Sequence, residues 1–140
     1  MDAILAKEGG IPLWAVVNNA ACLVFGEIEW QTRRQIQLQA DVNLVGPILV
    51  TKAFLPLLRV SSGRILNLTS QSVEWALPFY GPYGASKAGL EAASDSLRLE
   101  MKKFFVDVVL LDPGNHPMAT PLNLRQKVGW LSASIPIAKI

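Results

Sequence analysis

A tyrosine and a lysine four residues apart, Tyr83 and Lys87, form the pair in this sequence that most clearly suggests chemistry. If the segment from Tyr83 onward is helical, both side chains leave one face of the helix, one turn apart. A phenol titrates near pH ~10, so it exchanges protons poorly at neutral pH unless a cation stabilises the phenolate. Lys87 is placed to be that cation. Ser70, at the end of an apolar run, could hydrogen-bond the same substrate oxygen.

A Tyr-x-x-x-Lys pair alone also arises by chance, so the composition and the surrounding elements must decide its meaning. The chain has 140 residues, of which 51% are hydrophobic and 17% charged, which is typical of one packed domain. A net charge of +2 without a Lys/Arg block argues against nucleic acid as a partner. The single cysteine, Cys22, and the single histidine, His116, exclude an internal disulfide and a metal centre rich in cysteine or histidine.

The longest apolar segment covers residues 44–58, and Gly46, Pro47, Lys52 and Pro56 interrupt it. We therefore expect no transmembrane segment in this chain. Residues 1–12 contain no apolar stretch long enough for a secretory signal.

Short apolar runs alternate with longer helical patterns along the chain. Runs at 13–17, 63–69 and 106–111 predict strands, and the first suits a strand buried on both faces of a parallel sheet. The patterns at 30–58 and 83–101 predict helices. The order strand, helix, strand, helix, strand predicts an α/β fold whose candidate residues follow the carboxyl ends of strands.

Pro47 lies inside the first predicted helix and gives Asn43 a special position. A proline has no N–H to donate to the carbonyl four residues back, which here belongs to Asn43. That carbonyl could accept from a water molecule instead. The other interpretation, an ordinary kink with Asn43 merely exposed, stays open at this point.

Several motifs occur in a fixed order and spacing: Asn18-Asn19-Ala20, Asn43, Ser70, Tyr83-x-x-x-Lys87 and Pro113-Gly114. They resemble the short-chain dehydrogenase/reductase family over about residues 13–122. Its branch of 3-hydroxybutyrate, retinol and 17β-hydroxysteroid dehydrogenases is similar to the segments 13–20, 54–59, 90–98 and 112–115 with Thr120. The resemblance implies the C-terminal part of a Rossmann-like doubly wound parallel sheet, with three strands and their helices.

The resemblance implies an oxidoreductase that uses NAD or NADP to interconvert a secondary alcohol and a ketone. Tyr83 would transfer the proton, Lys87 would lower the pKa of Tyr83 and hold the nicotinamide ribose, and Ser70 would hold the substrate oxygen. The main-chain carbonyl of Asn43 would anchor a water leading to Lys87, which agrees with the position of Pro47. Further cofactor contacts would come from Asn19, Ala20, Pro113, Gly114 and Thr120, and further substrate contacts from Ser72 and Trp75.

Two departures from the family pattern stand out. Ala21 occupies a position where the family usually has glycine, and no glycine-rich loop follows a strand before residue 13. Such a loop and the helix after it would hold the cofactor pyrophosphate. We therefore expect a fragment of a longer protein or a truncated product: one partial domain over residues 1–140, with 123–140 not assignable to an element.

The resemblance also implies a small apolar alcohol or ketone as substrate and a homo-oligomer in the full-length form. It leaves the compartment unknown within the cell, with the mitochondrion and the endoplasmic reticulum as candidates. The alternative function is a truncated, non-catalytic interaction module that dimerises through its two long helices.

Overall fold

Three strands run parallel in one sheet in the order β1-β2-β3. They are β1 (Ala15–Asn18), β2 (Arg64–Leu68) and β3 (Asp107–Leu111), in a computed structural model that describes residues 11–113. Val16 lies opposite Ile65, and Ile65 lies opposite Val108. The predicted α/β fold with a parallel sheet is confirmed, and each strand lies within a residue or two of its predicted run.

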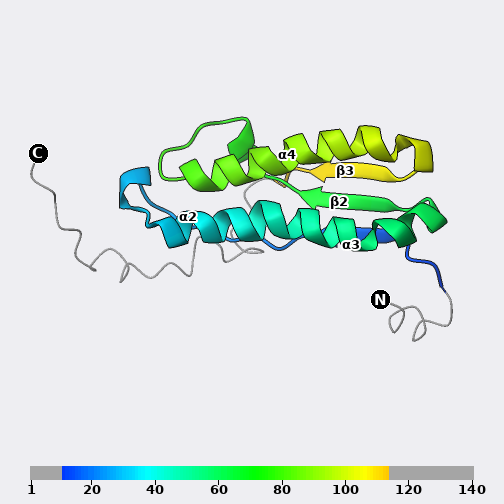
Figure 1. Cartoon of the computed structure of the whole chain (residues 1–140). Coiled ribbons are helices and arrows are strands. Elements are labelled where there is room, and N and C mark those ends of the chain that lie inside the picture. Colours follow the sequence, from blue (N-terminus) through cyan, green and yellow to red (C-terminus); the bar gives the residue numbers. More distant parts are fainter. Residues whose placement is uncertain (1–10, 114–140) are drawn as a thin grey trace, which may run out of the picture.

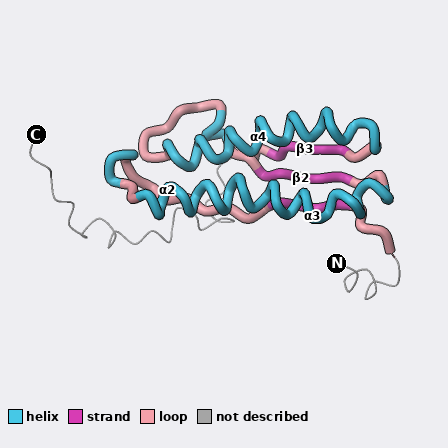
Figure 2. The backbone as a smooth tube through the Cα atoms, viewed as in Figure 1, coloured by secondary structure: helices cyan, strands magenta, loops and turns pink. Residues whose placement is uncertain are grey.

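Helices follow the first two strands and cover one face of the sheet (Figures 1 and 2). The first helical stretch is α2 (Arg33–Ala40), a π-helical turn (Asp41–Val45) and α3 (Gly46–Ser61), and the second is α4 (Gly81–Met101). Both helices lie on the same face because two successive right-handed crossovers advance the sheet in one direction. The predictions for residues 123–140, Gly114 and Thr120 concern positions outside the described residues, as does the prediction for most of residues 1–12.

The boundaries of the first helical stretch follow from its sequence. Thr32 caps the start of α2, since its hydroxyl accepts from the Gln35 N–H and the Gln35 side chain accepts from the Thr32 N–H. Ser62 ends α3 in a left-handed conformation, with φ of 49°. The helix thus begins later and ends later than the predicted 30–58.

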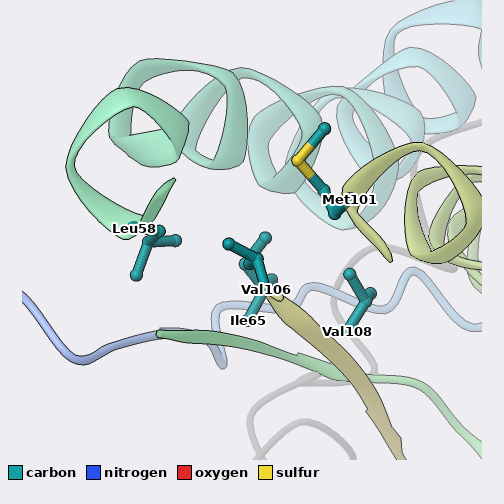
Figure 3. Close-up of a cluster of buried hydrophobic side chains, with 5 residues drawn as sticks. All are labelled: Leu58, Ile65, Met101, Val106 and Val108. Carbon is teal, nitrogen blue, oxygen red and sulfur yellow. The ribbon is translucent and has the colours of Figure 1, made fainter. Parts of the chain in front are cut away.

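The hydrophobic core lies between the sheet and the two long helices (Figure 3). Leu58 comes from α3 and Met101 from the end of α4, while the sheet contributes Ile65 and Val108. Ile65 and Leu58 are fully buried. Val106, just before β3, completes this cluster.

A buried polar layer continues this core toward the carboxyl ends of the strands. The Asn18 amide donates to Thr51 Oγ1 (3.1 Å) and to Asn67 Oδ1 (2.7 Å), and Asn67 donates to Ser94 Oγ (2.8 Å). These four side chains are all buried. Because they come from β1, α3, β2 and α4 in turn, the network ties both helices to the two strands.

The opposite face of the sheet is open in the described part of the chain. Val17 is 56% exposed and Leu111 is 41% exposed, although both belong to apolar strands. The prediction that the first strand is buried on both faces is therefore wrong for residues 11–113. The physical reason is that both helices lie on the other face, so nothing described covers this one.

The helical stretch Arg33–Ser61 also departs from expectation. It has 29 residues, and its most apolar window has a mean hydropathy of 1.5 and is 17% buried. Its length and composition alone would therefore allow it to cross a bilayer. Core helices of soluble proteins meet the same criteria. The prediction of no transmembrane segment is therefore not confirmed.

Candidate active site

The predicted catalytic residues Asn43, Ser70, Tyr83 and Lys87 all lie near the carboxyl ends of the parallel strands. Ser70 follows β2 by two residues, while Tyr83 and Lys87 belong to the first two turns of α4. Pro82 stands in the first turn of α4, where a missing N–H costs nothing and the proline φ suits the helix. Three of the four, Asn43, Tyr83 and Lys87, are buried, so the site is held rigidly by packing.

Lys87 is the most deeply buried charged residue in the described chain, with 2% of its surface exposed. Its Nζ donates to the carbonyl oxygen of Leu68 at 2.7 Å and lies 5.9 Å from the centre of the Tyr83 ring. Burial lowers the pKa of Lys87, because loss of water disfavours the ammonium. The predicted one-turn spacing thus places the amine beside the phenol and anchors it on β2.

Tyr83 is 7% exposed, and burial raises the pKa of its phenol above the ordinary value. The Ser70 side chain opposes this rise, because a hydroxyl beside the phenol can stabilise its charged form. The nearby Tyr80, Cys22 and Asp112 raise the pKa further. Tyr83 is therefore protonated at neutral pH in this structure, and its activation by Lys87 stays a prediction.

Ser70 and Ser72 form one hydroxyl unit in the short turn after β2. Ser70 Oγ accepts from the Ser72 N–H at 3.3 Å and from the Ser72 hydroxyl at 3.0 Å. Both of these bonds use Ser70 as acceptor, which leaves the Ser70 proton for another oxygen. Ser72, predicted to contact substrate, supports Ser70 in this geometry.

Asn43 lies in the π-helical turn and is fully buried, which rules out the interpretation that it is merely exposed at a kink. Gly46 N–H bonds the carbonyl of Asp41, five residues back, and Pro47 has no N–H to offer the Asn43 carbonyl. The water that this carbonyl would anchor stays a prediction.

The side chain of Asn43 has a role that sequence reasoning missed. Its Oδ1 accepts from the Cys22 N–H (2.8 Å), and its Nδ2 donates to the Cys22 carbonyl (2.8 Å) and to Ser86 Oγ (3.0 Å). Ser86 in turn donates to the carbonyl of Tyr83 at 2.7 Å. Asn43 therefore joins the loop after β1 to the helical turn that carries Tyr83. The available signal for Ser86 was its position three residues after Tyr83, on the same helix face.

The remaining predicted residues lie around this centre. Asn19 and Ala20 follow β1 and Pro113 follows β3, and all three are exposed. Trp75 is 69% exposed and lines a surface hollow of about 410 Å³ with Gln71, Glu74 and Leu77. Among residues 11–113, no group of three or more His, Cys, Asp or Glu side chains could hold a metal ion. Gly114 and Thr120 lie outside the described residues.

Comparison with known proteins bears directly on this arrangement. A family model described as short chain dehydrogenase matches residues 3–127. D-beta-hydroxybutyrate dehydrogenase, mitochondrial, of Mus musculus is 41% identical over 83% of this chain and 34% of its own length. Retinol dehydrogenase 7 of Mus musculus is 43% identical over 77% of this chain and 34% of its own length.

Solved structures show the same likeness in three dimensions. A short-chain dehydrogenase from Streptomyces avermitilis has a TM-score of 0.74 at 30% identity, covering 81% of this chain and 42% of its own. An alcohol dehydrogenase from the archaeon Thermococcus sibiricus, complexed with 5-hydroxy-NADP, has a TM-score of 0.74 at 27% identity, covering 81% and 46%.

This chain spans about a third of the length of the curated relatives that it matches. The family model nevertheless covers residues 3–127, and the solved relatives share the fold of this chain. The chain therefore belongs to the short chain dehydrogenase family of Rossmann-fold oxidoreductases.

Proposed function

We propose that this chain carries the proton-transfer site of an NAD(P)-dependent oxidoreductase that interconverts a secondary alcohol and a ketone. The observation that carries the proposal is the meeting of Tyr83, Ser70 and the buried Lys87 at the carboxyl edge of the sheet. The nearby Ser70 side chain lowers the pKa of Tyr83, and Lys87 Nζ is 5.9 Å from the centre of the Tyr83 ring. Two hydroxyls that converge beside a buried cation can hold and protonate one substrate oxygen.

In the direction of ketone reduction, Tyr83 donates its proton to the substrate oxygen while Ser70 donates a hydrogen bond to the same atom. In alcohol oxidation, the Tyr83 phenolate takes the hydroxyl proton back, and the Lys87 ammonium stabilises the negative charge. The bound nicotinamide cofactor supplies or accepts the hydride. The burial of Tyr83 and Lys87 limits competing exchange of protons with water.

The residues present fit one end of a nicotinamide cofactor. An ammonium has three N–H donors, and the Leu68 carbonyl takes one from Lys87, so donors remain for ribose hydroxyls. Asn19, Ala20 and Pro113 are exposed at the same edge of the sheet. Two solved relatives are described as complexes with 5-hydroxy-NADP or NADP, and we propose NAD or NADP for this chain without a preference.

The proposed substrate is a small apolar alcohol or ketone. The names of two relatives specify D-beta-hydroxybutyrate, a small secondary alcohol with a carboxylate, and retinol, a large apolar primary alcohol. What the two molecules share is a carbon that bears a hydroxyl group. Exposed apolar side chains of the loop before α4, Trp75 and Phe79, are suited to contact an apolar substrate. The first of these names specifies the mitochondrion, and we propose the mitochondrion or the endoplasmic reticulum as the compartment of this protein.

We also propose that the full-length protein pairs with a second copy through its long helices. Ile48, Leu49 and Val50 on α3 are 42%, 57% and 41% exposed, which is unusual for consecutive apolar residues. Size-exclusion chromatography should then show a dimer or larger, and a monomer at micromolar concentration would contradict the pairing. The alternative of a non-catalytic module receives no support from the relatives, which are named as dehydrogenases or reductases.

The test of the proposed reaction uses the longest natural form of the protein with NAD and NADP. Hydroxybutyrate, retinol and steroid alcohols are offered, and the reduced nicotinamide is measured by its absorbance. Tyr83→Phe should abolish turnover, whereas Tyr80→Phe, the same change three residues earlier, should retain it. Turnover that survives Tyr83→Phe undiminished, or no turnover with any substrate, would refute the proposal.

A further inference from the structure

Gln39, near the end of α2, is a polar side chain with no exposed surface and no part in the proposed proton transfer. Its Oε1 accepts from the Val24 N–H at 3.0 Å. Its Nε2 donates to Gln31 Oε1 at 2.9 Å and to the Gln35 carbonyl at 3.2 Å. Replacing a buried amide whose oxygen and both hydrogens are bonded costs free energy, because its partners lose their hydrogen bonds. The partners of Gln39 therefore indicate what this side chain does.

Gln31 extends this contact to the same loop. While its oxygen accepts from Gln39, its Nε2 donates to the carbonyls of Val24 (3.2 Å) and Gly26 (2.8 Å). Val24 is therefore held at its N–H by one glutamine and at its carbonyl by the other. We call Gln31 and Gln39 the glutamine clamp. The clamp fixes the backbone on both sides of Phe25.

The clamped loop holds the segment that leads into α4. Gly26 N–H donates to the carbonyl of Phe79 at 3.2 Å, and the rings of Phe25 and Phe79 are 5.0 Å apart. Phe79 has a φ of 72°, a left-handed conformation that is unfavourable for a bulky residue and persists only where its surroundings enforce it. The loop supplies two of the contacts that enforce it.

Aromatic contacts then reach the proposed proton donor. The Phe25 and Tyr80 rings meet edge to face with centroids 5.5 Å apart at 88°, and the Tyr80 and Tyr83 rings are 6.1 Å apart at 74°. Edge-to-face packing depends strongly on the relative orientation of the rings. A displacement of Phe25 would therefore change the position of the Tyr80 ring and, through it, the packing of the Tyr83 ring.

We propose that the glutamine clamp is a positioning device for the active site: Gln39 and Gln31 hold Phe25 so that Phe25, Phe79 and Tyr80 form a wall against Tyr83. The catalytic meaning of this wall rests on the proposed function of Tyr83. The geometry itself does not, and it is measurable without turnover. Gln39 and Gln31 touch neither substrate nor cofactor in this scheme, so they act only through the loop and the wall.

The chain contains a built-in reporter for the loop, because its one cysteine is Cys22, two residues before Val24. Cys22 is partly buried, so the rate at which an aromatic disulfide reagent labels it in the folded chain reports how far the loop shields this thiol. Gln39→Met and Gln31→Met nearly keep side-chain volume and remove the hydrogen bonds. Each should raise the labelling rate on the order of tenfold, the effect of losing the one bond that Gln39 or the two bonds that Gln31 makes to the loop.

Gln37→Met is the matched control, since Gln37 lies on the same helix, is exposed, and bonds the side chain of Asp41. It should leave the labelling rate within about twofold of the parent chain. Asn43→Ala is the positive control, since it removes the two hydrogen bonds to the Cys22 backbone and should raise the labelling rate of Cys22.

The wall is tested by the titration of Tyr83, followed by tyrosinate absorbance in a Tyr80→Phe background that leaves Tyr83 as the only tyrosine. The groups that face Tyr83 are Ser70, Tyr80, Cys22, Asp112 and Lys87. Burial raises the pKa of Tyr83, so a loosened wall that admits water should lower it toward the ordinary value. A role confined to stability would leave this titration unchanged.

Faster labelling together with a lower pKa of Tyr83 in both clamp variants, and neither change in Gln37→Met, supports the positioning role. Folded clamp variants that match Gln37→Met in both measurements overturn it. If Gln39→Met does not fold, the partly exposed Gln31→Met decides on the same criteria. Failure of the proposed reaction would instead appear as absent turnover in the unsubstituted protein, with these two measurements unaffected.

Discussion

Truncation of the Asn43 side chain is the perturbation whose effect follows most directly from the structure. The side chain makes hydrogen bonds to the Cys22 N–H, to the Cys22 carbonyl and to Ser86 Oγ, and it is fully buried. Every residue has a main-chain carbonyl, so Asn43→Ala removes none of the predicted water-anchoring group. The substitution therefore separates the role of the side chain from the role of the main chain.

The magnitude can be worked from the three bonds. A net contribution of about 1 kcal/mol for each gives about 3 kcal/mol, and leaving the two Cys22 backbone groups without a partner adds to this loss. We expect Asn43→Ala to lower the free energy of unfolding by about 3 kcal/mol or more. Ser86→Ala, which removes the bond from Asn43 and the bond to the Tyr83 carbonyl, should cost about 1 to 2 kcal/mol.

Urea unfolding followed by circular dichroism measures these values, with Gln37→Ala as the exposed control on the neighbouring helix. The double variant Asn43→Ala/Ser86→Ala completes a cycle, and the shared bond predicts a coupling of about 1 kcal/mol between the two sites. A loss below about 1 kcal/mol for Asn43→Ala, or a coupling near zero, would refute the view that Asn43 joins the loop after β1 to α4.

Three further predictions concern the sheet and the hydroxyl pair. Gly63→Ala should lower the free energy of unfolding by at least about 2 kcal/mol in urea melts, because its new Cβ would lie 2.4 Å from the Trp14 carbonyl oxygen; a neutral effect would contradict this close approach of the two backbone segments. Ser70→Ala should raise the pKa of Tyr83 further, since the nearby Ser70 side chain lowers it. Tyrosinate absorbance in a Tyr80→Phe background measures this pKa, and an unchanged titration would contradict a contact between the two hydroxyls. Because burial raises the pKa of Tyr83, the contribution of Tyr83 to stability is fully present below pH ~10 and is lost as the pH rises through the pKa of the folded state. Tyr83→Phe should therefore lose less stability at alkaline pH than the parent chain. Identical curves of unfolding free energy against pH above pH ~10 would contradict this prediction.

Sequence reasoning predicted most of the fold because the signals are local. Apolar runs of strand length, separated by helical periodicity, indicate an alternating α/β order wherever they occur. The boundaries of the first helix were less predictable, since the π-helical turn at Asp41–Val45 depends on Pro47 together with the packing of Asn43. The exposed face around Val17 was not predictable from an apolar run, because burial depends on which other elements reach that face.

In the candidate site, too, local features were predicted and contacts between distant segments were not. The spacing of Tyr83 and Lys87 determined their common helix face, and the positions after predicted strands determined the edge of the sheet where Ser70 and Asn19 would lie. Side-chain partners that are distant in sequence were missed: Asn43 with Cys22 and Ser86, Asn67 with Asn18 and Ser94, and Gln39 with Val24. No local pattern distinguishes a buried amide from an exposed one.

By itself, the sequence determined which groups could move a proton and that one helical turn separates the phenol from the amine. Only the tertiary structure decided their environment. Packing of α4 against the sheet buries Lys87 at the Leu68 carbonyl and buries Tyr83 near Ser70. This burial lowers the pKa of the amine and raises that of the phenol. The reason is physical: helix periodicity acts within a few residues, whereas desolvation and hydrogen bonding depend on segments that meet only after the chain has folded.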